Sequence, residues 1–343
     1  MSKKILILGM NGFIGSNLTE SILKNTDWEV YGMDLFSNKL GNLVEHERCH
    51  FTEGDVTLYK DWVEYHVKKC DVILPLVAVA TPSVYITNPM RVFELDFESN
   101  LPIVRHCLKY KKHLIFPSTS EVYGMSPEKE FNEESSPLMQ GPINKERWIY
   151  SCSKQLLDRV IYAYGNHGNA DEKLQFTLFR PFNWTGPKLD DVHNLQEGSS
   201  RVVSQFISNI IYGKNLQLVD GGLQKRCFTY IGDAVAALLK IIENKDGCAN
   251  GRIFNIGNPN NNASIREVAE KLLAIAKTYP KYKNVEEQVK IIITAPEKYY
   301  GAGYQDVSLR VPAIKNAQQY LDWQPTTDLD KILQLTLEYY LTM

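Results

Sequence analysis

Short apolar runs alternate with longer segments of helical spacing through the first half of the chain. Uninterrupted apolar runs of this length predict strands that are buried on both faces. They lie at Ile5–Leu8, Glu29–Met33, Val72–Leu76, Leu114–Phe116 and Phe176–Phe179. The segments with helical spacing lie at Asn17–Lys24, Asp61–Lys69, Arg91–Tyr110 and Trp148–Tyr164. This alternation predicts an α/β fold with a doubly wound parallel sheet of the Rossmann type.

The pattern changes after about residue 181, where glycine, proline and asparagine become frequent. Helices are expected near 200–212, 232–243 and 264–277, with a short strand at 253–256. We interpret residues 1–180 as a Rossmann domain and residues 181–343 as a smaller α/β lobe that faces a substrate. The chain is expected to return from this lobe to the sheet at least once.

Composition and charge exclude some classes of function. The chain has 343 residues and a formal net charge of -2, so it carries no basic field that would attract nucleic acids. No run approaches the ~18 apolar residues that a membrane span needs, and the N-terminal segment is too short for a signal-peptide core. The six cysteines are scattered without a C-x-x-C pair, and no histidines have metal-ligand spacing. We therefore expect a cytoplasmic protein that binds no metal, membrane or nucleic acid.

A glycine motif directly follows the first predicted strand and opens the first helix: Gly9-Met-Asn-Gly12-Phe13-Ile14-Gly15. Small residues at this turn let the backbone approach a pyrophosphate at the helix N-terminus. Asp34 ends the second strand, where a carboxylate binds the ribose hydroxyls and repels a 2′-phosphate. These residues predict a site for NAD rather than NADP. Asp55 follows the third strand and either meets the adenine edge or caps its own loop.

Tyr150 and Lys154 form a Tyr-x-x-x-Lys pair, and a spacing of four places both side chains on one helix face. The charge of Lys154, together with that of an oxidised nicotinamide, favours the phenolate, so Tyr150 can remove a hydroxyl proton. The same spacing occurs at Tyr65/Lys69 and Tyr279/Lys283, which we interpret as chance matches. Pro280 interrupts the second of these.

Three polar residues follow the strand at Leu114–Phe116, at the carboxyl edge where Rossmann ligands bind. Thr119 and Ser120 supply hydroxyls that can bind a reacting sugar oxygen. Glu121 adds acid–base capacity that simple oxidation does not require. The alternative interpretation of Glu121 is an acid at a helix N-terminus.

Several strings make the chain similar to a known family from residue 5 to about residue 340. They are the glycine motif, Ser118–Gly124, the Tyr150/Lys154 pair, Arg180–Pro187 and Arg226–Asp233. The chain resembles the extended short-chain dehydrogenase/reductases that act on nucleotide sugars. Within that group it most resembles the UDP-glucuronic acid decarboxylase (dehydrogenase) domains of the bacterial 4-amino-4-deoxyarabinose (polymyxin-resistance) pathway. The strings that carry this closer similarity are Glu64–Asp71, Phe93–Phe97, Pro142–Tyr150 and Gly303–Arg310.

The resemblance implies NAD as cofactor, UDP-glucuronate as substrate and a homodimer. It assigns catalysis to Tyr150, Lys154, Thr119, Ser120, Glu121 and Arg310, and it places Tyr85 near the sugar. It assigns the UDP contacts to Asn183, Arg201, Arg226 and Tyr304. Arg310 either pairs with the departing carboxylate or supplies a proton, and arginine is a poor acid. Gln217 departs from the family pattern, which has a lysine at this position.

The reaction implied by the resemblance is oxidative decarboxylation. Oxidation at C4 makes a β-keto acid, which loses CO₂ to give a UDP-4-keto-pentose and NADH. The first alternative is a UDP-xylose or UDP-apiose/xylose synthase that recycles its NADH. Another nucleotide-sugar epimerase or dehydratase, or a Rossmann protein that senses NAD without catalysis, are the remaining alternatives. The decarboxylating enzymes share the residues named above, so the sequence leaves the product open.

Overall fold

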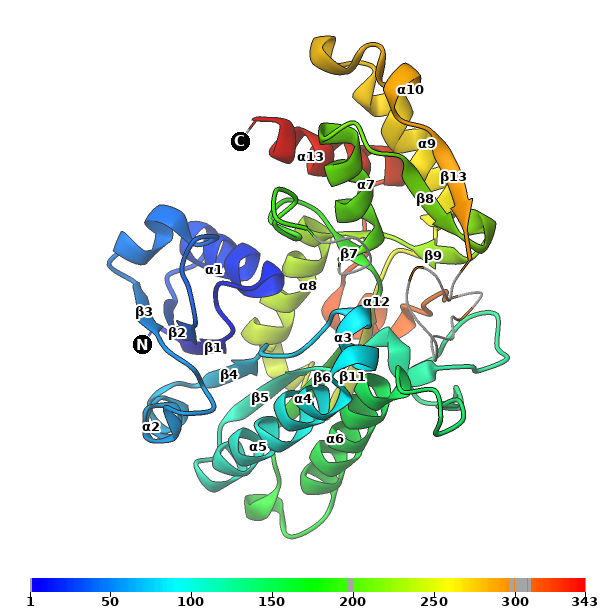
Figure 1. The fold of residues 1–343 in the computed structure, drawn as a ribbon. Helices are drawn as coiled ribbons and strands as arrows, with labels where there is room; N and C mark the ends of the chain where they lie inside the picture. Colours follow the sequence, from blue (N-terminus) through cyan, green and yellow to red (C-terminus); the bar gives the residue numbers. More distant parts are fainter. Residues whose placement is uncertain (1, 196–199, 296–298, 300–306, 308–309, 343) are drawn as a thin grey trace.

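The computed structural model describes residues 2–195, 200–295, 299, 307 and 310–342. Its centre is a seven-stranded parallel sheet with the strand order β11-β6-β5-β4-β1-β2-β3 (Figure 1). The strands are β1 (Lys4–Leu8), β2 (Glu29–Asp34), β3 (Cys49–Glu53), β4 (Val72–Pro75), β5 (His113–Pro117), β6 (Phe176–Pro181) and β11 (Arg252–Ile256). The direction of winding reverses between β1 and β4, which is where ligands bind in open α/β sheets. The predicted Rossmann-type fold is confirmed.

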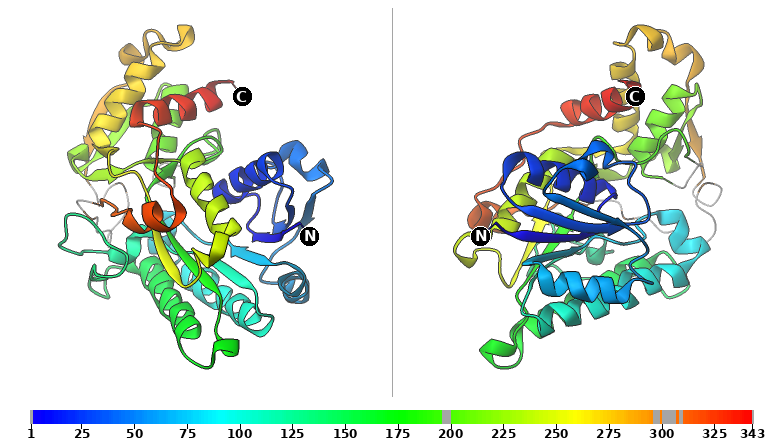
Figure 2. Two further views of the ribbon diagram at one scale, coloured as in Figure 1. Left: turned by 180° about the vertical axis from the view of Figure 1, so that it is seen from behind. Right: turned by 90° about the vertical axis from the view of Figure 1, so that its left-hand side faces the viewer.

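Helices cover both faces of this sheet (Figure 2). One layer contains α2 (Lys60–Lys69), α5 (Asn100–Lys109) and α6 (Trp148–Asn166), and the other contains α1 (Phe13–Asn25) and α8 (Ile231–Glu243). Successive residues of β1 alternate between the layers, because side chains on a strand alternate in direction. Leu6 and Leu8 join the core of the first layer, and Ile5 and Ile7 join that of the second. Burial on both faces explains the uninterrupted apolar runs.

The segment predicted as one helix over Arg91–Tyr110 contains an irregular turn. Helix α4 (Pro89–Phe93) runs into a π-helical turn, η2 (Glu94–Glu98), before α5 begins. The Ser99 amide donates to the Glu94 carbonyl, five residues earlier, at 2.8 Å. Such turns insert one extra residue into a helix and are frequent at functional sites. Here the turn directs Asp96 into the interior, where its side chain is fully buried.

A smaller mixed region follows β6 and lies beyond the carboxyl edge of the sheet (Figure 1). Helices α7 (Val202–Ile211), α9 (Ile265–Ala276) and α13 (Leu329–Thr342) pack together there. Three two-stranded sheets accompany them: β7 (Trp184–Thr185) with β10 (Thr229–Tyr230), β8 (Leu216–Val219) with β13 (Ile291–Thr294), and β9 (Lys225–Cys227) with β12 (Asn262–Ser264). The other elements are α3 (Pro82–Thr87), α10 (Val285–Gln288), α12 (Lys315–Leu321), η1 (Gly41–Glu45), η3 (Ser120–Tyr123), η4 (Ala170–Glu172), η5 (Asp220–Gly222), η6 (Lys245–Gly247) and η7 (Pro280–Tyr282).

The chain returns to the sheet after the smaller region begins. Strand β11 pairs in parallel with β6, in a register that runs from Arg252↔Thr177 to Ile256↔Pro181. Helix α12 packs against β11, and α8 packs against α1. Elements from beyond residue 181 therefore complete the Rossmann layers, and the division at residue 180 remains a prediction. Across the described residues, no helix combines the length and apolar character needed to cross a bilayer.

Candidate active site

A cavity of about 550 Å³ lies between the carboxyl edge of the sheet and the smaller region. It brings together most of the predicted site residues. These are Gly9, Gly12, Phe13, Ile14, Gly15, Tyr85, Thr119, Ser120, Glu121, Tyr150, Lys154, Asn183, Arg201, Arg226 and Arg310. Asp34 and Asp55 do not line it, and Tyr304 lies outside the described residues. Gln217 lines the cavity as well. Residues from every part of the chain thus converge on one space.

The glycine loop is shaped for close backbone approach. Gly9 has φ +86°, which favours glycine. A Cβ at residue 15 would collide with the Gly9 carbonyl and lie 2.7 Å from that of Met10, so only glycine lets α1 start this near the loop. The first turn of α1 contains no acidic residue, and its N-cap, Gly12, has no side chain to occupy the free amides. Such a helix N-terminus fits the pyrophosphate of a dinucleotide.

Asp34 stands beside the glycine loop at the end of β2. Its carboxylate accepts hydrogen bonds from the amides of Asn11 (2.9 Å) and Leu35 (2.8 Å). Burial raises the pKa of Asp34, and these amide bonds oppose the rise. The carboxylate is therefore held against the turn that would carry a cofactor, and the predicted ribose contact remains a prediction.

Asp55 has a local role in the structure. Its carboxylate accepts hydrogen bonds from the amide and hydroxyl of Thr57, at 2.8 and 2.7 Å. The side-chain bond from Thr57 lowers the pKa of Asp55. These contacts correspond to the loop-capping interpretation, and the predicted adenine contact remains untested.

Tyr150 lies in the first turn of α6 with its ring stacked on that of Tyr85, at a centroid distance of 4.7 Å and an interplanar angle of 7°. Both tyrosines are buried. Burial raises the pKa of Tyr150, Asp96 and Glu121 raise it further, and a hydrogen bond with Thr119 acts in the opposite direction. The protein groups alone therefore hold Tyr150 as a neutral phenol. The expectation that Lys154, together with an oxidised nicotinamide, favours the phenolate stays a prediction.

Burial is the largest cause of this raised pKa, and the second is a carboxylate that the sequence analysis did not identify. Lys154, one helical turn after Tyr150, places its ammonium nitrogen 3.3 Å from an Oδ1 of Asp96. Both side chains are buried, with 1% and 0% exposure. An opposite charge at this distance offsets much of the field of the lysine at Tyr150.

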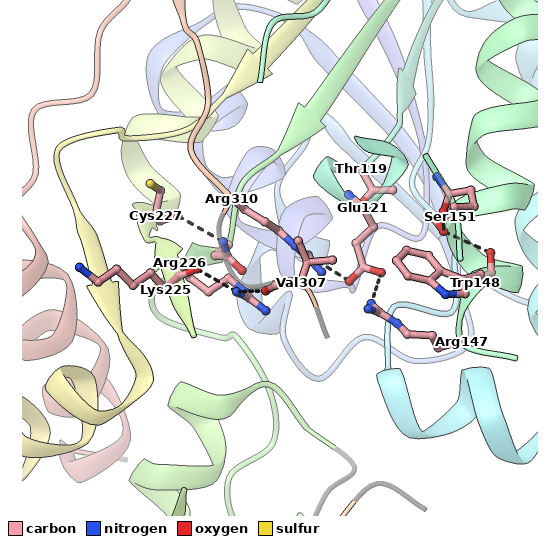
Figure 3. A network of polar contacts seen from close by, with 12 residues as sticks. Thr119, Glu121, Arg147, Trp148, Ser151, Lys225, Arg226, Cys227, Val307 and Arg310 are labelled. Atoms are coloured by element: carbon pink, nitrogen blue, oxygen red, sulfur yellow. Dashed lines mark hydrogen bonds and ion pairs between the residues drawn. The ribbon is translucent and has the colours of Figure 1, made fainter. Parts of the chain in front are cut away.

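A second group of charges lines the cavity around Glu121. Glu121 lies between two guanidinium groups, Arg147 at 2.8 Å and Arg310 at 3.3 Å (Figure 3). Burial favours the neutral carboxyl, but the two arginines outweigh it and lower the pKa of Glu121 below its usual value. The carboxylate is therefore ionised at neutral pH. The side chains of Arg147 and Arg310 are only 2% and 8% exposed.

Arg147 is a second residue that sequence reasoning missed. It immediately precedes α6, and its guanidinium also lies over the Trp148 ring, 4.7 Å from the centroid. No motif singles it out from the other arginines of the chain, since its role depends on Glu121, which is 26 residues away. Its near-complete burial is visible only in the folded chain.

Three further predicted residues line the same cavity. Arg226, on β9, donates to the Val307 carbonyl at 2.7 Å. Asn183 adopts φ +42° and donates to the Cys227 carbonyl at 3.4 Å. Arg201 forms a double hydrogen bond with Asp190 and lies over the Phe13 ring, 5.2 Å from the centroid. Arg201 is thus nearer the glycine loop than its predicted UDP role suggests.

Comparison with solved structures identifies similar chains. The PbgP3 protein of Burkholderia pseudomallei is 57% identical, with a TM-score of 0.89, and the match covers 99% of this chain and 96% of that chain. UDP-glucuronic acid 4-epimerase from Bacillus cereus, solved with UDP-glucuronic acid and NAD, is 21% identical, with a TM-score of 0.79 and 99% coverage of both chains. A dTDP-glucose 4,6-dehydratase from Bacillus anthracis is 20% identical, with a TM-score of 0.78 and coverage of 99% and 97%. The last two show a shared fold.

The family model described as "NAD dependent epimerase/dehydratase family" matches residues 5–257. This range contains the glycine loop, Tyr150, Lys154 and the return strand β11. It agrees with the resemblance to extended short-chain dehydrogenase/reductases and with NAD as the predicted cofactor. The chain belongs to the NAD-dependent epimerase/dehydratase family.

Proposed function

We propose that the protein catalyses oxidative decarboxylation of UDP-glucuronate. The products would be a UDP-4-keto-pentose, CO₂ and NADH. The observation that carries this proposal is the position of Glu121 between two buried guanidiniums in the same cavity as Tyr150 and Lys154. Oxidation of a neutral sugar needs only the tyrosine and lysine, whereas a sugar acid also needs cations that can bind its carboxylate.

The first half of the reaction belongs to Tyr150. NAD⁺, when bound, accepts the hydride from C4. The phenolate of Tyr150 takes the proton of the C4 hydroxyl, and Thr119 and Ser120 orient that oxygen from the end of β5. The product of this half is a ketone β to the C6 carboxylate.

The second half breaks the C5–C6 bond. The electron pair of that bond moves into the new carbonyl and forms an enolate as CO₂ leaves. C5 must then be protonated to give the keto-pentose. Glu121, as an ionised carboxylate, would orient a water molecule and relay its proton to C5, while Arg147 and Arg310 hold the substrate carboxylate until it departs as CO₂.

In this proposal the substrate carboxylate shares the guanidiniums of Arg147 and Arg310 with Glu121. Each guanidinium has several donors, so it can bind Glu121 and a second carboxylate together. The carboxylate of Glu121 carries one negative charge and the two arginines carry two positive charges. This part of the cavity therefore has a net positive charge, which suits an anionic group. A sugar without a carboxylate would leave that charge unmatched.

By the resemblance, Asn183, Arg226 and Tyr304 would contact the nucleotide, with Tyr85 near the sugar and Arg201 toward the phosphates. The resemblance to UDP-glucuronic acid decarboxylase domains supports this assignment, as does the UDP-glucuronic acid bound by the Bacillus cereus epimerase. We also infer a homodimer, because α6 leaves Leu156 and Tyr162 about half exposed on its outer face. Light scattering would test that inference.

The deciding experiment mixes the purified protein with UDP-glucuronate and excess NAD⁺, and follows NADH absorbance while mass spectrometry identifies the nucleotide product. NADH that grows in step with a decarboxylated UDP-keto-pentose would establish the proposal. A UDP-pentose without net NADH would select a UDP-xylose or UDP-apiose/xylose synthase, and an isomer of unchanged mass would select an epimerase. Absence of turnover with bound NAD⁺ would contradict the substrate assignment and leave a sensor as the alternative. UDP-glucose serves as the control substrate without a carboxylate.

A further inference from the structure

The buried pair between Asp96 and Lys154 is unusual because its two charges leave hydrogen-bonding capacity unused. Asp96 accepts one hydrogen bond through Oδ2, from the Val79 amide at 2.9 Å. Its Oδ1 lies 3.3 Å from the Lys154 ammonium nitrogen, and that contact is the closest that the lysine makes to a carboxylate among the described residues. Removing two charges from water is costly, so a pair with so few compensating bonds is weak as a stabilising device.

The local backbone is arranged around this carboxylate. Asp96 lies in the middle of η2, the π-helical turn, and Asn100 donates to the Leu95 carbonyl at 2.9 Å within that turn. Asn100 is itself 1% exposed. In a regular α-helix the side chain of residue 96 would point in a different direction about the helix axis. The π-helical turn is therefore what directs Asp96 toward Lys154.

We propose that Asp96 is a positioning residue for the hydride-transfer site: it holds the ammonium of Lys154 in place and offsets its charge, and thereby sets the proton affinity of Tyr150. This inference rests on the proposed role of Tyr150 as the group that takes a hydroxyl proton. Asp96 acts through Lys154 and through its own field, and it does not line the cavity.

The charges around Tyr150 come from several elements. Those that face it or its lysine are Asp96 on η2, Glu121 on η3, Tyr85 on α3, Lys154 and Asp158 on α6, and the arginines Arg147, Arg201 and Arg310. Glu121 is already matched by two of these arginines. Asp96 is matched by Lys154 alone, so a change at residue 96 acts directly on the lysine and the tyrosine.

The consequence is that Tyr150 keeps its proton in the free protein. Burial, Asp96 and Glu121 all raise the pKa of Tyr150. Removing the Asp96 charge takes away the carboxylate that is paired with Lys154 at 3.3 Å, so more of the lysine field acts on the phenol and favours the phenolate. The ionisation of Tyr150 should therefore move to lower pH when Asp96 is replaced by an uncharged side chain of the same size.

The test is a tyrosinate titration of Asp96→Asn in saturating NAD⁺, read in the ultraviolet absorption band of tyrosinate. Each protein is compared with the same protein carrying Tyr150→Phe, so the difference isolates Tyr150 from the other tyrosines. We expect the midpoint of Asp96→Asn to fall by about 1 pH unit or more relative to the unaltered protein. Glu98→Gln removes an exposed carboxylate from the same turn and should leave the midpoint unchanged. An unchanged or higher midpoint in Asp96→Asn would overturn the proposal.

A second measurement remains informative if Asp96→Asn is too unstable to titrate. Lys154→Met leaves Asp96 as an unpaired buried charge, so its melting temperature should fall further than that of the double variant Asp96→Asn/Lys154→Met. Melting-temperature losses that simply add would overturn the pairing. Neither measurement uses a sugar substrate, so failure of the UDP-glucuronate assignment would be seen separately from failure of this proposal.

Discussion

The two sides of the cavity present different kinds of chemical group. The cofactor side is made of backbone: Gly9 and Gly15 allow close approach, and the free amides at the start of α1 provide the charge. The sugar side is made of buried charged side chains that pair with one another, with Glu121 between Arg147 and Arg310.

This difference means that cofactor binding and substrate selection depend on different groups. A backbone cradle accepts any pyrophosphate, and its shape changes little between relatives of one family. Side-chain charges can change one residue at a time, so the sugar side can select one substrate while the cofactor side stays fixed. Variants on each side should therefore fail in different ways.

The largest effect is expected at the point where the two sides meet. Tyr150→Phe should lower kcat by about 10³-fold, because general acid–base groups contribute about 10²–10⁴. Binding of NAD⁺, measured by calorimetry, should be nearly unchanged. Tyr65→Phe is the matched control, since Tyr65 begins another Tyr-x-x-x-Lys string but is 60% exposed on α2. Equal losses in the two variants would contradict the assignment of Tyr150.

A smaller but more selective effect is expected on the sugar side. Arg147→Gln should reduce kcat/KM for UDP-glucuronate by about 10²-fold or more, since truncating one member of a buried charge pair costs about 2–5 kcal/mol. Arg147→Lys should recover part of this loss because it restores the charge without the planar fork. Arg105→Gln, at an exposed site on α5, controls for net charge. A loss of NAD⁺ affinity in Arg147→Gln, with UDP-glucuronate affinity unchanged, would contradict the comparison.

On the cofactor side, Gly15→Ala should weaken NAD⁺ binding by about 10- to 100-fold. The added methyl would press on the Gly9 and Met10 carbonyls, and overpacking of this kind costs about 1–3 kcal/mol. Gly54→Ala is the control, because its new Cβ would meet only the side chains of Tyr59 and Met33, at 3.2 and 3.3 Å. Binding isotherms for UDP and NAD⁺ should show that only the second is affected.

The smallest expected effect is on the free energy of unfolding, at a buried carboxyl that does not line the cavity. Glu133 is buried, and this raises the pKa of its carboxyl to about 7, although the Asn255 amide donates to it at 2.8 Å. A raised carboxyl pKa means that the folded state favours the protonated form. Stability from this group is complete below the unfolded pKa of about 4.3 and is lost as pH rises through about 7.

Glu133→Gln imitates the protonated form and should remove that loss. Between pH 5 and 8, the free energy of unfolding should fall by about 1–3 kcal/mol more in the unaltered protein than in the variant. Denaturant titrations at several pH values would measure the difference. Glu130→Gln changes an exposed carboxylate of the same segment and should leave the pH dependence as it is. Parallel pH profiles for Glu133→Gln and the unaltered protein would refute the prediction.

How far the sequence predicts this molecule depends on how local each interaction is. The sheet and the glycine loop follow from short strings, because apolar runs and close glycines act over a few residues. Arg147 and Asp96 could not be identified in this way, since their partners lie 26 or more residues away. The π-helical turn could not be predicted either, because the apolar spacing over Arg91–Tyr110 is compatible with a regular helix.

The return of β11 to the sheet has a consequence for biosynthesis. While the ribosome has produced only the first 181 residues, β6 is an open edge strand, and Phe179 lacks the later residues that bury it, among them Trp184. Exposed apolar edges of this kind invite pairing with other chains. The nascent protein must therefore be shielded until β11 emerges. Premature stop codons or proteolytic nicks between β6 and β11 should yield aggregates rather than a free-standing cofactor-binding fragment.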